Sequence, residues 1–247
     1  MEHEEFTVTG LTAGYRRSTV LHGVDLTVPP GQAVAVLGPN GAGKSTLLGA
    51  ISGLVDVRAG SIRLGSTDLR GKSSHAIVRL GVVHVPQGRR VFPEFTVTEN
   101  LRAASYVHGS RTLAADTERV FEAFPSLARR RSVRAGLLSG GEQQMLAVAR
   151  AVVQRPRLLL IDEMSLGLAP IVVGQLYAQL PTLFPGVPAL IVEQNPGMAL
   201  RHCSSAYVLS SGRVVTSGSV EELSSTETLM DAYVGANHTT HTSDSQR

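Results

Sequence analysis

The chain is poor in cysteine and lysine, and it has no long apolar run. Its single cysteine, Cys203, cannot form an intrachain disulfide, which agrees with a reducing compartment, and we expect it to be a small buried apolar residue. No stretch approaches the roughly 20 apolar residues of a membrane span. The acidic start, Met1–Glu5, lacks the apolar segment of a signal peptide, so any work at a membrane needs another chain as the anchor. The formal net charge of +3 is too small to indicate nucleic acid, and we expect no nucleic-acid partner.

The chain does contain enough apolar residues for a large core. Its 247 residues are 43% hydrophobic and 17% charged, which is typical of one large α/β domain or of one domain with a subdomain. Short apolar and polar runs alternate through residues 6–37, which predicts antiparallel strands and turns. Ser61–Leu64 and Val82–Val85 predict further short strands. From Thr98 to about Arg134 the apolar spacing becomes helical, and Glu142–Val153 predicts another helix. We therefore expect a helical subdomain inserted into an α/β core.

A glycine-rich pattern, G-x-x-x-x-G-K-[ST], lies between the apolar run Ala33–Leu37 and the predicted start of a helix at Ser45–Leu54. It consists of Gly38, Pro39, Asn40, Gly41, Ala42, Gly43, Lys44, Ser45 and Thr46. The glycines let successive N–H groups form an anion-binding nest, and the helix N-terminus adds partial positive charge. We expect Lys44 to reach the β- and γ-phosphates and the Ser45 hydroxyl to take one Mg²⁺ position. A glycine-rich turn that merely contains a lysine is the alternative, but the chain has only one other lysine, Lys72.

A second pattern is the run Leu138–Gln144, with Ser139, Gly140, Gly141 and Glu142 directly before a helical segment. Ser-Gly-Gly at a helix start offers unobstructed N–H groups and a helix dipole to an anion. An ordinary serine N-cap followed by two flexible glycines is the alternative.

A third pattern is the apolar run Leu158–Ile161, followed at once by Asp162 and Glu163. Four consecutive apolar residues predict a parallel strand that is buried on both faces. Its carboxyl end is where open α/β sheets bind ligands. We expect Asp162 to hold Mg²⁺ through water and Glu163 to polarise an attacking water. A strand that simply ends in solvated acids is the alternative.

Together the three patterns resemble the ATP-binding subunits of ABC transporters, from about Phe6 to Val234, and Leu138–Gln144 resembles the signature of that family. The resemblance implies an α/β P-loop NTPase core, in which a mostly parallel sheet is flanked by helices. It also implies an N-terminal antiparallel β subdomain and a helical subdomain inserted at about residues 88–140. On this basis residues 6–234 form one ATP-binding domain. Residues 238–247 are polar and aperiodic, so we expect a disordered tail there.

The resemblance also assigns roles to single residues. Tyr15 is placed like the aromatic residue that stacks on adenine, with a tyrosine on the strand surface as the alternative. Gln87 resembles the glutamine that links Mg²⁺ and the water site to the transport subunit, and Glu163 matches the catalytic carboxylate. Ser165–Leu168 resembles the loop that crosses to the partner subunit. Gln194 falls at the catalytic switch position, where the family usually has histidine.

Three segments resemble one of the two ATPases of branched-chain amino-acid importers, the LivF type. They are Gly88–Pro93, Ser165–Pro170 and Val192–Asn195. Gln194 for histidine and Ala169 for the usual aspartate are then traits of the subgroup, whereas Met164 for a common proline has no clear consequence. Gln87 is less typical, because the subgroup often has glutamate there. Val85–Arg89 also resembles urea importers, which are the alternative substrate class.

The resemblance implies that ATP, with Mg²⁺, is held between the P-loop of one subunit and the signature of its partner, and that hydrolysis lets the pair open. It implies a heterodimer with a second ATP-binding subunit. That pair would dock near Gly88–Phe95 on integral membrane permease subunits, at the cytoplasmic face of the cell membrane, and would be served indirectly by a solute-binding protein.

Two other classes of protein compete with this interpretation. A soluble ABC ATPase of DNA repair or of ribosomes usually carries a coiled-coil insertion or two cassettes, for which 247 residues leave no room. A nucleotide-gated module without hydrolysis is suggested by Gln194, but the presence of Lys44, Asp162 and Glu163 argues against it.

Overall fold

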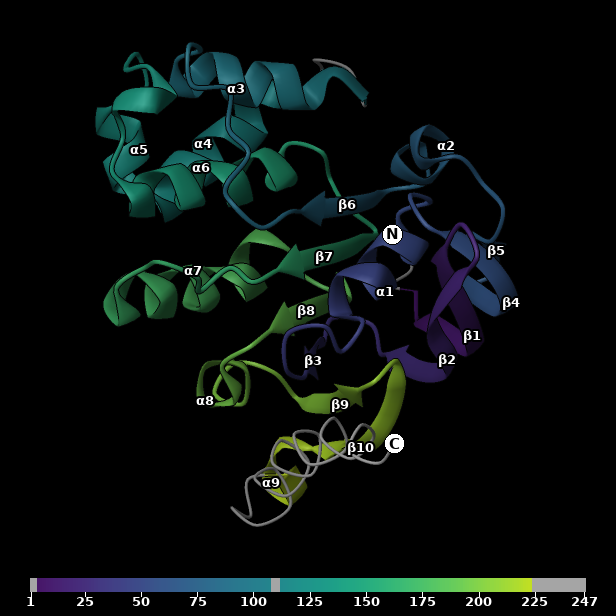
Figure 1. Ribbon diagram of the computed structural model, residues 1–247. Helices are drawn as coiled ribbons and strands as arrows, with labels where there is room; N and C mark the ends of the chain where they lie inside the picture. Colours follow the sequence, from purple (N-terminus) through teal and green to yellow (C-terminus); the bar gives the residue numbers. More distant parts are fainter. Residues whose placement is uncertain (1–3, 108–111, 224–247) are drawn as a thin grey trace, which may run out of the picture.

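The computed structural model describes residues 4–107 and 112–223, which form two β-sheets with helices around them (Figure 1). The smaller sheet is antiparallel, in the order β2-β1-β4-β5. Its strands are β1 (Phe6–Tyr15), β2 (Ser18–Val28), β4 (Asp56–Leu64) and β5 (Thr67–Asp68). The antiparallel strands predicted before the glycine-rich loop are therefore confirmed. The predicted strand Ser61–Leu64 is only the end of β4, because pairing with β1 extends back to Asp56 through residues without an apolar pattern.

The larger sheet has six strands in the order β10-β9-β3-β8-β7-β6. They are β3 (Ala33–Leu37), β6 (Val82–Val85), β7 (Leu158–Asp162), β8 (Ala189–Glu193), β9 (Ser205–Ser210) and β10 (Arg213–Ser219). Five of these strands pair in parallel, and β10 pairs antiparallel with β9. Since parallel strands end at one edge of their sheet, the residues that follow β3, β6, β7 and β8 are brought together there.

Most of the helices are short. They are α1 (Lys44–Ile51), α2 (Ser74–Arg79), α3 (Val97–Ala104), α4 (Leu113–Ala123), α5 (Pro125–Arg129), α6 (Gly140–Val152), α7 (Pro170–Leu183), α8 (Pro196–Ala199) and α9 (Val220–Leu223), with 3₁₀ turns at Ser105–Val107 and Ala135–Leu137. The predicted helical stretch from Thr98 to Arg134 is confirmed as α3, α4 and α5. Thr96 caps the start of α3, and Pro125, as the first residue of α5, separates that helix from α4. Across the described ranges, every helix is too short or too polar to cross a bilayer.

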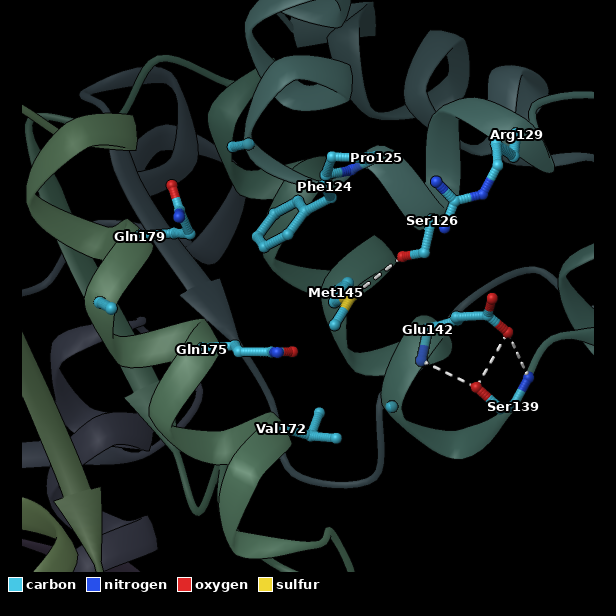
Figure 2. A pocket seen from close by; sticks show the side chains of 13 residues that line it. Phe124, Pro125, Ser126, Arg129, Ser139, Glu142, Met145, Val172, Gln175 and Gln179 are labelled. Atoms are coloured by element: carbon cyan, nitrogen blue, oxygen red, sulfur yellow. Dashed lines mark hydrogen bonds between the residues drawn. The ribbon is translucent and has the colours of Figure 1, made fainter.

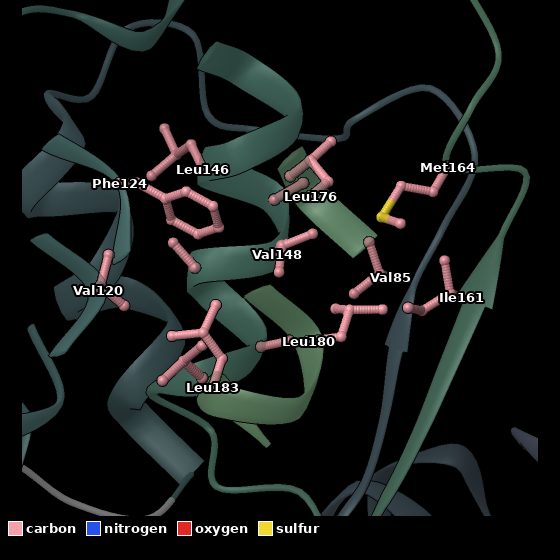
Figure 3. Close-up of a cluster of buried hydrophobic side chains, with 14 of the residues drawn as sticks. Val85, Val120, Phe124, Leu146, Val148, Ile161, Met164, Leu176, Leu180 and Leu183 are labelled. Carbon is pink, nitrogen blue, oxygen red and sulfur yellow. The ribbon is translucent and has the colours of Figure 1, made fainter. Parts of the chain in front are cut away.

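Two apolar clusters meet at the larger sheet. One lies between this sheet and the helices α3 to α7, and Figure 3 shows Ile161 and Met164 of the strand β7 region packed there with side chains of α6 and α7. The other surrounds α1, between the two sheets. Leu158 and Leu160 belong to the second cluster, whereas Leu159 and Ile161 belong to the first. Strand β7 is therefore buried on both faces, as its apolar run predicts. Figure 1 shows α3 to α6 gathered beyond β6, away from β1, β2 and β4.

The predicted tail at residues 238–247, and the last part of the predicted domain 6–234, lie outside the described residues.

Candidate nucleotide-binding site

The glycine-rich loop joins the carboxyl end of β3 to the N-terminus of α1. Gly43 is the N-cap of α1, and no side chain caps that helix. Its φ of 107° suits glycine, and a Cβ there would stand 2.8 Å from Leu21 Cδ2 of β2. The backbone thus turns tightly into the helix, and the N-terminal N–H groups of α1 have no side-chain acceptor at the cap. This is the arrangement in which a helix N-terminus binds phosphate.

Lys44, the first residue of α1, is 5% exposed and bends back over the loop. Its Nζ donates to the carbonyl oxygens of Gly38 at 2.8 Å and Pro39 at 3.1 Å. The same Nζ lies 3.9 Å from Glu163 Oε1. Burial lowers the pKa of Lys44, and the negative charges of Glu163, Asp162 and Glu193 oppose that shift. The lysine is therefore held at the position where a nucleotide's phosphates would compete for it.

Two acids end strand β7 beside this lysine. Burial, with the neighbouring charge of Glu163, raises the pKa of Asp162 from 3.8 to about 6, while Lys44 opposes the shift. Glu163 adopts a left-handed backbone with φ of 45°, and its Oε2 accepts a hydrogen bond from Gln87 Nε2 at 2.8 Å. Gln87 follows β6, so residues 76 positions apart meet at one edge of the sheet. The structure brings together Lys44, Gln87, Asp162 and Glu163, as the sequence predicts.

Gln194 follows β8 and lies near the same acids. It is exposed and lines a cleft of about 240 Å³ that is also lined by Glu163, Ser165 and Glu193. The predicted switch residue thus shares a cleft with the predicted catalytic carboxylate. A water beside Glu163 would stand within this cleft.

Sequence reasoning missed Glu193, the last residue of β8. It is 1% exposed, and its carboxylate accepts hydrogen bonds from Ser165 and Tyr177. Its position could have marked it, because an acid directly after the apolar run Ala189–Val192 repeats the arrangement of Leu158–Asp162. The pattern does not show which acids at a sheet edge turn inward.

The Ser139–Glu142 turn forms a complete capping box at the N-terminus of α6. Ser139 Oγ accepts from Glu142 N at 3.3 Å, and Glu142 Oε2 accepts from Ser139 N at 2.9 Å and Ser139 Oγ at 2.8 Å. Glu142 Oε1 also lies 3.0 Å from Arg130 Nε. The N-cap alternative therefore describes the side chains well. It does not exclude anion binding, since the N-terminal N–H groups of Gly140 and Gly141 belong to the backbone.

This turn lies on a cleft of its own, of about 610 Å³, between the helical subdomain and α7 (Figure 2). Figure 2 shows Ser139 and Glu142 on one side and Val172 and Gln175 of α7 opposite. A Cβ on Gly141 would stand 3.0 Å from Val172 Cγ1. The residues lining this cleft and those lining the Gln194 cleft are different sets. The structure therefore brings Lys44 of the glycine-rich loop beside Glu163, while the Ser139–Glu142 turn lines a different cleft from Glu163.

Tyr15 lies at the end of β1, where it pairs with Ser18 across the turn to β2, and it is 50% exposed. Strand β2 of the same hairpin reaches the glycine-rich loop, because Leu21 packs beside Gly43. The structure leaves the aromatic face of Tyr15 accessible, which both interpretations of this residue require.

Comparison with known proteins gives the family. The model of the family described as ABC transporter matches residues 21–165. The chain is 42% identical over 222 residues to the high-affinity branched-chain amino acid transport ATP-binding protein BraG of Pseudomonas aeruginosa. The aligned region covers 90% of this chain and 95% of that protein. It is 37% identical over 215 residues to the probable branched-chain amino acid transport ATP-binding protein LivF of Archaeoglobus fulgidus, covering 86% and 91% of the two chains.

The solved structures agree with this result. The ADP conformation of MJ1267, an ATP-binding cassette of an ABC transporter, matches with a TM-score of 0.81 at 25% identity, over 94% of this chain and 99% of that chain. The chain belongs to the ABC transporter family, as an ATP-binding subunit with the ATPase cassette fold. The predicted family, fold class and enzyme class are thereby confirmed. Its relatives in the branched-chain amino-acid group confirm the resemblance to that subgroup.

Proposed function

We propose that this chain binds and hydrolyses ATP to drive an importer of branched-chain or other hydrophobic amino acids. The observation that carries the catalytic part is the meeting of Lys44, Gln87 and Glu163 at the carboxyl edge of the sheet. The names of BraG and LivF support the substrate class.

Lys44 is the residue that would recognise the phosphates. Its ammonium is balanced by the carbonyl oxygens of Gly38 and Pro39 and by Glu163. A β- or γ-phosphate oxygen carries more negative charge than a carbonyl oxygen, so it would take over these hydrogen bonds. The uncapped N–H groups of α1 add further donors, which Gly38–Thr46 presents as one nest.

Glu163 is the residue that would polarise the attacking water. Once Lys44 turns to phosphate, Glu163 keeps its hydrogen bond from Gln87, which fixes the carboxylate at the mouth of the cleft. Gln194 lines the same cleft and has an amide N–H that can donate to a γ-phosphate oxygen. It cannot carry the positive charge of a histidine, so its contribution is orientation alone.

The residues at the sheet edge also fit Mg²⁺. The Ser45 hydroxyl, the Gln87 amide oxygen and the Asp162 carboxylate are oxygen donors of the kind that this ion prefers. The described residues hold no group of three His, Cys, Asp or Glu side chains that would make a metal site without help, so nucleotide phosphates would complete the ligand set. The electrostatics favour a cation too, because the negative charges of Glu163, Asp162 and Glu193 all act on Lys44. When bound, Mg²⁺ would neutralise phosphate charge.

A second subunit is needed to complete the site. The turn Ser139–Gly141 lines a different cleft from Glu163. Its backbone N–H groups, with Glu142 as the cap, would therefore serve the nucleotide of a partner. We propose a heterodimer, because the LivF type pairs with a different ATPase. Tyr15 would stack on the adenine.

The segment Gly88–Phe95 is the surface we propose for the integral membrane permease, which would hold the chain at the cytoplasmic face of the membrane. Phe92 is 43% exposed and Phe95 45% exposed. Buried Asn100 donates to the carbonyl oxygens of both and holds the segment in place. We also propose that residues 6–234 form the ATP-binding domain, with a helical subdomain inserted at about residues 88–140, which the family match over residues 21–165 supports.

The test is uptake in a reconstituted complex. The chain would be assembled with its permease and second ATPase in vesicles, and ATP hydrolysis would be followed with labelled leucine and with labelled urea outside. Leucine uptake that depends on ATP and is lost in Lys44→Ala supports the proposal. Urea uptake would replace the substrate class, and a wild-type complex without ATP turnover would favour the module without hydrolysis.

A further inference from the structure

Glu193 is a buried carboxylate that accepts most of its hydrogen bonds from the loop after β7. At the end of β8 it is 1% exposed. Its Oε1 accepts from Ser165 N at 3.1 Å and from Tyr177 Oη at 2.9 Å, and its Oε2 accepts from Ser165 Oγ at 2.6 Å. Two of these three hydrogen bonds therefore come from Ser165, the second residue after the candidate catalytic Glu163.

A charge at this depth requires a reason. The residues before it, Ala189–Val192, are all buried and apolar, and an apolar residue would extend this strand without a desolvation cost. A buried carboxylate is tolerated when several donors satisfy it, and such hydrogen bonds are stronger than neutral ones. The arrangement thus replaces an apolar contact with a strong and directional anchor for Ser165.

The anchor acts on a turn whose backbone is unusual. Glu163 has a left-handed φ of 45°, which few residues other than glycine adopt. On one side the turn is held by the hydrogen bond from Glu163 N to Val192 O at 2.9 Å. On the other side it is held by Glu193 through Ser165. Consecutive residues of β8 therefore fasten the chain before and after Met164, which is 1% exposed and points into the apolar cluster of Figure 3.

We propose that Glu193 is a positioning residue, which holds Ser165 so that Glu163 keeps the backbone conformation that aims its carboxylate at the cleft. The same hydrogen bonds set the path of the exposed loop that follows, in which Leu166 is 57% exposed. The inference rests on the proposed role of Glu163 in ATP hydrolysis. It adds that β8, the strand directly before Gln194, also sets the geometry of the catalytic turn.

Electrostatics at the site agree with this placement. The negative charge of Glu193 raises the pKa of Lys44 and that of Asp162, although burial dominates both shifts. Glu193 thus lies close enough to the phosphate site for its charge to be felt there. A substitution of Glu193 alters both the hydrogen bonds of the turn and the negative charge near the phosphate site. The test therefore also includes substitutions of Ser165, which change the hydrogen bond but not the charge.

Tyr177 supplies the matched control. It donates to the same carboxylate, but from α7, and its ring stacks on His202 at 4.7 Å. Tyr177→Phe removes one hydrogen bond from Glu193 without touching the catalytic turn. Ser165→Ala removes one hydrogen bond of similar length from the turn itself. Ser165→Thr keeps the hydroxyl and is the rescue variant.

The experiment is single-turnover ATP hydrolysis by the assembled complex, with the partner's own site disabled. Ser165→Ala and Glu193→Gln should each slow hydrolysis by roughly 10- to 100-fold, the size of effect expected from a catalytic group displaced by about 1 Å. Their double variant should slow hydrolysis by less than the product of the two single effects, because both changes weaken the same anchor. Ser165→Thr and Tyr177→Phe should stay within about threefold of wild type. ATP affinity should be unchanged in the Ser165 and Tyr177 variants, whereas Glu193→Gln also removes a negative charge near the phosphates.

A second measurement does not depend on turnover. Amide hydrogen exchange in the isolated chain should show the Ser165 amide exchanging faster in Glu193→Gln, while the strand amides of β8 stay protected. An unchanged Ser165 amide would overturn the inference, and so would equal slowing of hydrolysis by Tyr177→Phe and Ser165→Ala. A wild-type complex without ATP turnover would instead overturn the proposed function, and the exchange measurement would still decide whether Glu193 anchors the turn.

Discussion

Replacing Asp162 by asparagine should remove a specific pH dependence from the stability of the nucleotide-free chain. Burial and the charge of Glu163 raise the pKa of Asp162 from 3.8 to about 6 in the folded chain. The folded state therefore holds this proton more tightly than the unfolded state does. The stability that the group contributes is fully present below its ordinary pKa and is lost as the pH rises through about 6.

The size of the effect follows from the shift. A change of about two pKa units corresponds to about 3 kcal/mol, at about 1.4 kcal/mol for each unit. Asp162 is partly exposed, and solvent screening reduces this value, so we expect a loss of about 1–2 kcal/mol between pH 4 and pH 7. Asp162→Asn stays neutral throughout and should not show this loss.

The assay is urea unfolding of wild type and Asp162→Asn at half-unit steps across that range, without nucleotide. The free energy of unfolding of wild type, minus that of the variant, should fall as the pH rises and level off above pH 7. Asp56→Asn, at an exposed position in β4, is the control for the Asp-to-Asn substitution itself. A flat difference for Asp162→Asn would refute the reasoning. In wild type the affinity for ATP with Mg²⁺ should weaken below about pH 6, where this carboxylate takes up its proton.

Three further changes test the remaining roles. Lys44→Ala should weaken ATP binding by roughly 10-fold or more in a folded chain, because its ammonium balances phosphate charge, and unchanged affinity in a calorimetric titration would remove the central claim. Gly141→Asp should leave ATP binding to the isolated chain nearly normal but abolish ATP-driven pairing, measured by sedimentation. Gly141→Ala is its control, since both bring a Cβ to 3.0 Å from Val172 Cγ1 but only the aspartate adds charge. Glu163→Gln should slow single-turnover hydrolysis by on the order of 10²–10⁴-fold and trap a dimer with ATP bound, whereas Gln194→His should change the rate far less. Normal hydrolysis by Glu163→Gln would show that the catalytic roles are assigned wrongly.

The larger sheet shows how far the sequence could predict the site. The runs that became β3, β6, β7 and β8 are apolar and short, and a chemically informative residue follows each of them. Because parallel strands end at one edge, these positions alone predict the meeting of Lys44, Gln87 and Glu163. The strand boundaries at β6 agree with the prediction, since both ends of the apolar run coincide with the ends of pairing.

Other parts could not be predicted in this way. The hairpin β9–β10 has a weakly alternating sequence, so β9 depends on its pairing with β3, and β10 on its pairing with β9, rather than on local pattern. The capping box at Ser139 could be predicted, but not that it faces α7 across a cleft. The inward position of Glu193 depends on donors from Ser165 and Tyr177, which lie 28 and 16 residues away. Long-range donors of this kind leave no signal in local spacing.

The hydrogen bonds of Lys44 bear on how quickly a nucleotide can be captured. Within the loop Gly38–Gly43, Ala42 N donates a hydrogen bond to Pro39 O at 3.2 Å. Lys44 Nζ donates to the carbonyl oxygens of Gly38 and Pro39. A loop fixed by its own hydrogen bonds loses little conformational entropy when a ligand binds. Capture then requires the buried Lys44 side chain to exchange carbonyl oxygens for phosphate oxygens. Association with ATP should therefore be limited by diffusion and orientation, and the lifetime of the complex by what surrounds the phosphates afterwards.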